Sequence, residues 1–210
     1  MTYLVDNFGQ VLDLTGTHLY LALLPLVIGL ALAIPLGVLI RNVSWLRRGT
    51  LTAASIAYTI PSLALLVIIP PLVGLSILDP LVVVIALTIY STALLVRAVP
   101  EALDAVSPAV IDASNAMGYT PFRRVLTVDL PLAIPVLTTS VRVVAVTNIS
   151  LVPVGSLIGV HGLGYLFTDG YARNYVDEIV AGVIAVVVLA LLFDIVLFWV
   201  GRLLTPWSSS

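Results

Sequence analysis

A polar block of about 28 residues at 104–131 is the part of this chain whose residue types and spacing indicate a function. Hydrophobic segments flank it on both sides, so it must lie outside the lipid. Ser107 suits a helix cap and Pro108 the first helical position, while Gly118 and Pro121 end the helix. The block therefore predicts a short helix held at a membrane surface, where it offers a contact site to a partner protein.

A second group of polar side chains lies inside a hydrophobic segment. Arg142 falls ~16 Å into that segment by helical rise, near mid-bilayer, and Thr147 and Asn148 follow it. A charge at this depth is costly and normally faces an interior. We expect Arg142 either to line a transport pathway or to form a structural ion pair. Asp194 is a candidate partner, but its predicted depth in the last hydrophobic segment differs, so a direct pair is not expected.

The composition sets the class of protein. Of 210 residues, 60% are hydrophobic and 10% are charged, whereas soluble domains carry roughly 25% charge. The mean hydropathy is +1.18. The chain is therefore expected to be a single polytopic membrane domain. The absence of cysteine excludes disulfides, thiolate metal sites and cysteine nucleophiles, and the absence of lysine excludes a phosphate-binding Gly-Lys loop. Residues 1–14 lack the basic start of a signal peptide, so we expect them to be mature sequence.

Hydropathy predicts an all-α fold with five membrane spans, because a helix needs ~20 apolar residues to cross the bilayer and apolar runs of this length cannot be strands. Several prolines lie in or near the first two spans, which indicates kinked helices packed on other helices. The spans are expected at about 19–40, 51–73, 81–99, 131–152 and 179–203, with a connecting loop at about 100–130.

Arginine placement predicts the orientation. If the spans alternate, seven arginines fall on one side, and only Arg173 falls on the other, together with six acidic residues. This split predicts an external amino terminus, an internal carboxyl terminus and a cytoplasmic loop at 100–130. The seven are Arg41, Arg47, Arg48, Arg97, Arg123, Arg124 and Arg202.

Other motifs indicate no catalytic, metal or nucleic-acid site. His18 and His161 are isolated in the sequence, at the predicted outer face, and lack a second metal ligand at helical spacing; His161 is expected to contact a partner or solvent. The glycine-rich segment 155–164 follows a span and opens no βα unit, so we expect an extracellular turn or re-entrant gate. Two other classes of membrane protein would carry different sequence features. An ion-coupled transporter or channel would show internal repeats and buried carboxylates. An intramembrane enzyme would show clustered His, Asp or Glu within its spans.

The polar block resembles the loop of permeases from binding-protein-dependent ABC importers. That family's pattern is Glu-Ala-Ala, three residues, Gly, nine residues, Ile, one residue, Leu-Pro. This chain has Asp for Glu, Ser for the second Ala and Val for Ile, and keeps every spacing. The resemblance implies a coupling helix that docks into a cleft on a cytoplasmic ATPase. The matching residues are Asp112, Ala113, Ser114, Gly118, Val128, Leu130 and Pro131.

Three further segments are similar to the osmoprotectant subfamily, which transports glycine betaine, choline, carnitine or proline. They begin at Tyr58, Val154 and Arg202 and extend the resemblance over most of residues 50–207. Permeases of methionine or other amino-acid importers share the five-span plan and the loop, and remain the alternative. The expected candidates for the translocation pathway are Arg142, Thr147, Asn148, Pro61 and Ser62.

The resemblance also implies the partners. Two cytoplasmic ATPase subunits would bind ATP and Mg, so this chain would carry no cofactor and no catalytic residue. A second permease subunit, identical or paralogous, would complete the pathway in the bacterial cytoplasmic membrane. An extracytoplasmic binding protein would deliver the solute and would supply any aromatic cage for a quaternary ammonium group.

Overall fold

The computed structural model describes residues 2–208, and all of the secondary structure in that range is helical. The long helices are joined by short loops, and a π-helical turn and two 3₁₀ segments interrupt or follow them. In chain order the elements are α1 (Thr2–Asp6), α2 (Phe8–Arg41), α3 (Ser44–Thr59), α4 (Ser62–Val73), α5 (Pro80–Asp104), α6 (Pro108–Ala116), α7 (Pro121–Arg124), the π-helical η1 (Val125–Asp129), α8 (Leu130–Leu151), the 3₁₀ segment η2 (Val152–Ile158), α9 (Tyr165–Ala172), α10 (Val176–Leu204) and the 3₁₀ segment η3 (Pro206–Ser208).

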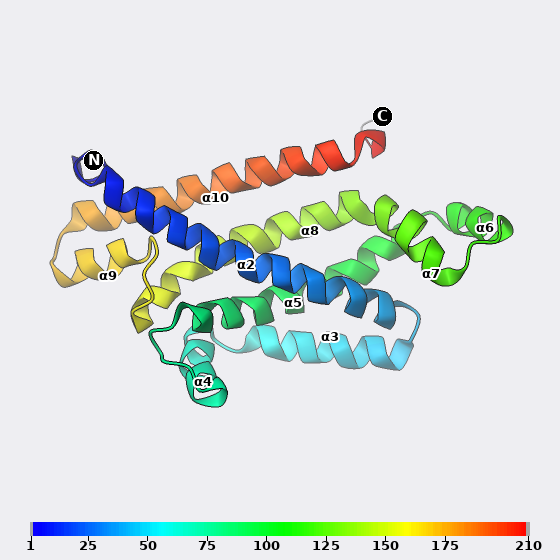
Figure 1. Cartoon of the computed structure of the whole chain (residues 1–210), viewed down its shortest axis with the longest axis horizontal. Helices are drawn as coiled ribbons and strands as arrows, with labels where there is room; N and C mark the ends of the chain where they lie inside the picture. Colours follow the sequence, from blue (N-terminus) through cyan, green and yellow to red (C-terminus); the bar gives the residue numbers. More distant parts are fainter. Residues whose placement is uncertain (1, 209–210) are drawn as a thin grey trace.

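The long helices α2, α3, α5, α8 and α10 run roughly along the longest axis of the molecule (Figure 1). Helices α6 and α7 protrude at one end, which we call the loop end, and α9 lies at the other. Within residues 2–208, four helical segments are long and apolar enough to cross a membrane, and α3 with α4 makes a fifth if the pair is counted as one span. The predicted all-α membrane fold is confirmed.

The second predicted span, 51–73, is formed by two helices rather than one, and the prolines that predicted a kink coincide with a sharp break. Helices α3 and α4 are bent by 102° at a break between them. Ile60 has an extended backbone at φ −65° and ψ 127°, as the following Pro61 favours. The hydroxyl of Tyr90 on α5 donates a hydrogen bond to the carbonyl of Ile60. The break is therefore anchored to α5, and a backbone acceptor that the bend frees from the helix ladder is satisfied.

Helices α2 and α5 pack with their backbones close together because small residues line the contact. A Cβ added at Gly29 would lie 2.6 Å from the Cβ of Ser91, and one added at Gly37 would lie 2.5 Å from the Cβ of Val99. Ala33, between the two glycines, is fully buried. This pair forms the centre of the bundle, against which α3 and α8 pack.

His18 is buried, not isolated at the outer face as the sequence suggested. Its Nε2 lies 3.0 Å from the carbonyl oxygen of Ile149, and the backbone N–H of Leu163 donates to its Nδ1 at 3.3 Å. Because Nδ1 accepts this bond, the hydrogen-bond network assigns the ring proton to Nε2. The neutral ring thus joins α2 to the end of α8 and to the loop before α9.

A polar cluster at the end opposite α6 fixes the amino-terminal helix. The hydroxyl of Tyr3 donates to Oε1 of the buried Glu178 at 2.9 Å, and Arg173 pairs with both Glu178 and Asp169. Burial, followed by the hydrogen bond to Glu178, raises the pKa of Tyr3 to about 12. Tyr3 therefore stays a neutral donor at physiological pH, and the bond holds α1 against α10.

Replacing Gly29 by alanine should lower stability, because its Cβ would also lie 3.1 Å from the backbone nitrogen of Thr92, which side-chain rotation cannot move. Overpacking of this kind costs about 1–3 kcal/mol. Gly49→Ala is the matched control, since a Cβ at Gly49 meets nothing within 4 Å. We expect the heat-unfolding midpoint of the detergent-solubilised protein to fall for Gly29→Ala and to stay or rise for Gly49→Ala. Equal midpoints would contradict the close α2–α5 packing.

Candidate functional site

The loop between α5 and α8 forms the protruding helix that the sequence predicted. Pro108 occupies the first turn of α6, while the side chain of Ser107 makes no capping hydrogen bond. Gly118 has a φ of +78°, the left-handed conformation that glycine tolerates best. The N–H of Tyr119 then donates to the carbonyl of Ser114 at 3.2 Å, which closes the helix end. The predicted end of the helix at Gly118 is confirmed.

The motif's closing Leu130-Pro131 coincides with a change in helix geometry. The N–H of Leu130 bonds to the carbonyl of Val125, five residues earlier, so that η1 is one wide π-helical turn. Pro131 has no N–H and cannot donate to the carbonyl of Thr127. The helical path nevertheless continues from Pro121 to Ile158. Because π-turns often accompany functional positions in helices, the wide turn marks the junction of the loop and α8.

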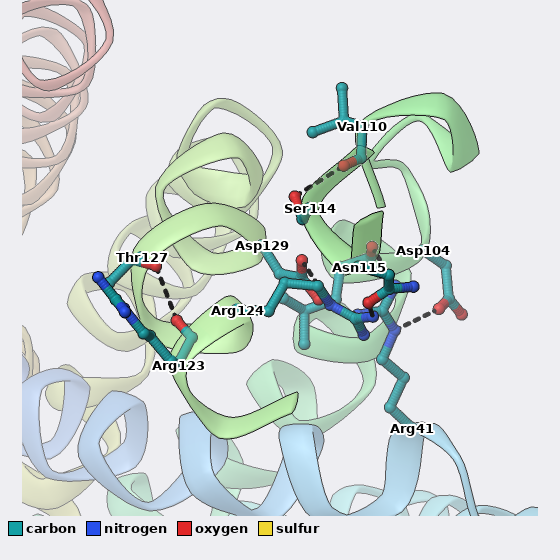
Figure 2. Close-up of polar contacts among 10 residues, drawn as sticks. Arg41, Asp104, Val110, Ser114, Asn115, Arg123, Arg124, Thr127 and Asp129 are labelled. Atoms are coloured by element: carbon teal, nitrogen blue, oxygen red, sulfur yellow. Dashed lines mark hydrogen bonds and ion pairs between the residues drawn. The ribbon is translucent and has the colours of Figure 1, made fainter. Parts of the chain in front are cut away.

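Asp129, in this wide turn, is the buried centre of the loop's anchorage. Its side chain is 0% exposed, and Nη1 of Arg41 lies 2.8 Å from its Oδ2. Nε of Arg41 also pairs with Asp104 at 2.9 Å, and Nη2 donates to the carbonyl of Leu103 at 2.7 Å. One arginine at the end of α2 thus holds the end of α5 and the start of α8 together (Figure 2).

A second arginine connects this anchorage to the protruding helix. Nε of Arg124 lies 3.4 Å from Oδ1 of Asp129, and its Nη1 donates to Oδ1 of Asn115 in α6 at 2.9 Å (Figure 2). The bond to Asn115 is charge-assisted and so stronger than a neutral one, whereas the contact with Asp129 is an ion pair without a hydrogen bond. They form a continuous connection from α6 through Arg124, Asp129 and Arg41 to α2. We call Arg41, Asp104, Arg124 and Asp129 the ion-pair cluster.

The exposed surface of α6 and α7 can pack closely against another protein. Asp112 and Ala113 are exposed, whereas Ser114 is buried and its hydroxyl donates to the carbonyl of Val110 at 2.7 Å. Met117 is 69% exposed and Phe122 is 76% exposed. Large apolar side chains outside the lipid, next to small ones, are typical of an interaction site.

The doubt about a direct pair between Arg142 and Asp194 was wrong. Nε of Arg142 lies 2.8 Å from Oδ1 of Asp194, and Nη2 lies 2.7 Å from Oδ2. The two residues form a bidentate pair between α8 and α10. Arg142 lies 11 residues from the predicted span edge at 131, and Asp194 lies 9 residues from the edge at 203. This difference of two residues is only about 3 Å of helical rise, which the long arginine side chain spans.

The candidate pathway residues do not gather in one place. Thr147 and Arg142 line the same cavity on the surface of α8. Asn148 is 1% exposed and lies in the core, where its Nδ2 donates to the carbonyl of Ala22 and to Ser91 at 3.0 and 2.9 Å. Pro61 and Ser62 lie at the break between α3 and α4. Asn148 thus joins α8 to α2 and α5, as buried amides between membrane helices do.

The sequence comparison identifies the family. Residues 26–210 match the family described as the inner membrane component of binding-protein-dependent transport systems. The chain belongs to this family. The protein is therefore a membrane permease of this family.

Two curated relatives have nearly the same length as this permease. The osmoprotectant import permease protein OsmW of Salmonella typhimurium is 34% identical over 97% of this chain and 96% of its own. The glycine betaine/carnitine/choline transport system permease protein OpuCB of Bacillus subtilis is 31% identical over 98% of this chain and 94% of its own.

Solved structures of related transporters share the fold of this permease. An inward-facing structure of the MetNI methionine ABC transporter has a TM-score of 0.83 at 24% identity and covers 95% of this chain and 98% of its own. An amino acid ABC transporter with histidines has a TM-score of 0.75 at 18% identity and covers 96% of this chain and 97% of its own. At these identities the likeness shows the fold alone.

Asp129→Asn should destabilise the protein more than Asp104→Asn. Breaking a buried pair costs ~3–5 kcal/mol, and we expect the lower end because Arg41 keeps Asp104. The side chain of Asp104 is 42% exposed, and pairs of that kind contribute about 1 kcal/mol or less. Heat-unfolding midpoints of the two variants in detergent measure the difference. If Asp104→Asn lowers the midpoint as much as Asp129→Asn, the buried anchorage does not hold the loop.

Proposed function

We propose that this chain is the membrane permease subunit of an ATP-driven importer of osmoprotectants such as glycine betaine, choline, carnitine or proline. The observation that carries the proposal is the similarity of nearly the whole chain to OsmW and OpuCB, whose names state these solutes. The alternative, import of methionine or another amino acid, draws on the shared fold with MetNI. A fold is common to many substrates, so the full-length sequence similarity weighs more.

The proposed coupling element is α6 with the loop around it. A cytoplasmic ATPase subunit would dock on the exposed face that includes Asp112, Ala113 and Met117. Binding of ATP would bring the two ATPase subunits together, and this closure would move α6. The ion-pair cluster would carry that movement to the ends of α2, α5 and α8. The charged contacts have distances of 2.7 to 3.4 Å, so the loop moves with the bundle. Alternating access of the pathway would follow.

A second permease subunit is proposed to cover α10. Only 11% of the apolar window of this helix is buried within the chain, against 61% for α5. Several large side chains of α10, such as Leu191 and Trp199, are more than half exposed. This surface would be shared between lipid and the second subunit. An extracytoplasmic binding protein would dock at the end opposite α6.

Reconstituted uptake tests the function. The permease, its ATPase and its binding protein in proteoliposomes should take up labelled glycine betaine with ATP, and should not take up methionine. Uptake of methionine without glycine betaine would replace the proposal by its alternative.

The same assay tests coupling through Gly118. A Cβ there would meet nothing within 4 Å, so only its φ of +78° matters. Gly118→Val should abolish uptake and solute-stimulated ATP hydrolysis, because a β-branched residue resists this conformation. Gly118→Asn, which tolerates it, should retain most of both activities. If the valine variant is fully active, the loop does not couple ATP hydrolysis to transport.

The proposed orientation can be tested with single cysteines, since the chain has none of its own. Cysteine at Ser76 or Arg173 should react with an impermeant reagent in intact cells, because both would face outward. Cysteine at Thr120 should react only after permeabilisation. Ser76 and Arg173 follow α4 and α9, away from the loop end (Figure 1). External labelling at Thr120 would reverse the topology and remove the proposed docking site for the ATPase.

A further inference from the structure

The ion pair between Arg142 and Asp194 differs in its surroundings from the ion-pair cluster. The side chains of Arg142 and Asp194 are 28% and 33% exposed, whereas Asp129 is 0% exposed. Both helices that carry the open pair are apolar enough to span a membrane. Because charges at that depth do not face lipid tails without great cost, we expect this part of the surface to face the second subunit or a polar space beside it, while the rest of α10 faces lipid.

Two cavities share Thr139 and Arg142 in their lining. One, of about 410 Å³, is lined by Thr139, Phe198 and Arg202 as well as Arg142. The other, of about 390 Å³, is lined by Thr139, Thr147, Arg142 and Asp194. The guanidinium carbon of Arg142 lies 5.2 Å from the centroid of the Phe198 ring. A cation, an anion and an aromatic face thus line these two cavities.

The guanidinium of Arg142 retains unused hydrogen-bonding capacity. It binds Asp194 through Nε and Nη2, and within residues 2–208 its Nη1 has no hydrogen-bond acceptor. A carboxylate from the cavity therefore has donors to approach. The hydroxyl of Thr147, which lines the same cavity, donates to the carbonyl of Val143 at 2.8 Å and keeps its oxygen lone pairs as acceptors.

We infer that Arg142 and Asp194 form a transient binding site for zwitterionic solutes that carry both a carboxylate and an ammonium group. The solute's carboxylate replaces Asp194 on Arg142, while its ammonium group lies against Asp194 and the face of Phe198. The inference rests on the proposed function and adds residues and a solute class to it. No covalent step is involved.

Charge balance favours a zwitterion at this site. In the empty state Arg142 and Asp194 neutralise each other, and in the occupied state each has a partner of opposite charge on the solute. No charge is left unpaired in either state, so the exchange avoids the penalty of a buried lone ion. A cation without a carboxylate, such as choline, would take Asp194 and leave Arg142 without a partner. This site should therefore hold glycine betaine much more tightly than choline, whether or not the importer also carries choline.

Protection of a single cysteine tests the inference. Thr139 is exposed and lines both cavities, and Thr139→Cys introduces the chain's sole thiol. The permease–ATPase complex in nanodiscs, without binding protein, is treated with a neutral thiol reagent, and labelling is read on the permease. Glycine betaine should slow labelling by about threefold once it is present at roughly twice its Kd. Choline and sucrose at equal osmolality should have no such effect.

Two variants complete the test. Arg142→Gln combined with Asp194→Asn removes both charges and keeps two amides able to pair, and it should abolish the protection. Arg142→Lys keeps the ion pair but loses the planar fork, and it should reduce the protection even if the double variant assembles poorly. Co-elution with the ATPase verifies assembly of each variant.

Three results would overturn the inference: equal protection by choline, protection that persists in both variants, or no protection by glycine betaine at molar concentration. The wild-type uptake assay separates this failure from that of the proposed function. Uptake of glycine betaine without protection leaves the importer function in place and removes the site. Protection without uptake keeps the site and removes the importer function.

Discussion

The buried charge of Asp129 is the constraint on which the loop end of this permease depends. A carboxylate that is 0% exposed needs cationic partners, and Arg41 and Arg124 supply them. Because Arg41 closes α2 and Arg124 belongs to the loop, pairing both with one carboxylate fixes three elements at once. Asp104 accepts a hydrogen bond from Nε of Arg41 and so attaches the end of α5 to the same group of residues. Helix α6 is thereby attached to the bundle through charged contacts at both ends of its loop.

The two principal ion pairs of the chain show how surroundings separate structural from functional charges. Asp129 and Asp194 each accept bonds from arginine, and each joins different helices. Because Asp129 is fully buried, only its arginines can pair with its carboxylate, and these ion pairs do not readily exchange partners. Asp194 borders an open cavity, so its arginine can exchange partners without leaving the protein fold. The same chemistry therefore supports rigidity at the loop and exchange within the membrane.

The sequence predicted correctly the features that depend on residues close together in the chain. Long apolar segments can only be helices in lipid, and Pro108 and Gly118 delimit α6 in the structure as their conformational preferences require. It missed features that depend on which helices become neighbours. Asp129 occupies the unspecified position before Leu130 in the motif, so the sequence analysis assigned it no role. An acidic residue close to several arginines could nevertheless have indicated an ion pair. His18 and Asn148 proved to be bridges between helices, and hydropathy did not register the bend before Pro61 because the residues on both sides are apolar.

The close packing of α2 on α5 has a mechanical consequence. Helices α2 and α5, whose backbones lie close together at Gly29 and Gly37, resist bending and move as one rigid unit. Arg41, at the loop end of α2, joins this unit to the ion-pair cluster. Helix α5 has 25 residues, which at the helical rise makes it about 37 Å long, so that a tilt of about 5° displaces its far end by about 3 Å. A displacement of that size is comparable to the diameter of a water molecule. A slight rotation at the loop end would thus become a displacement of several ångströms at the opposite end of α5.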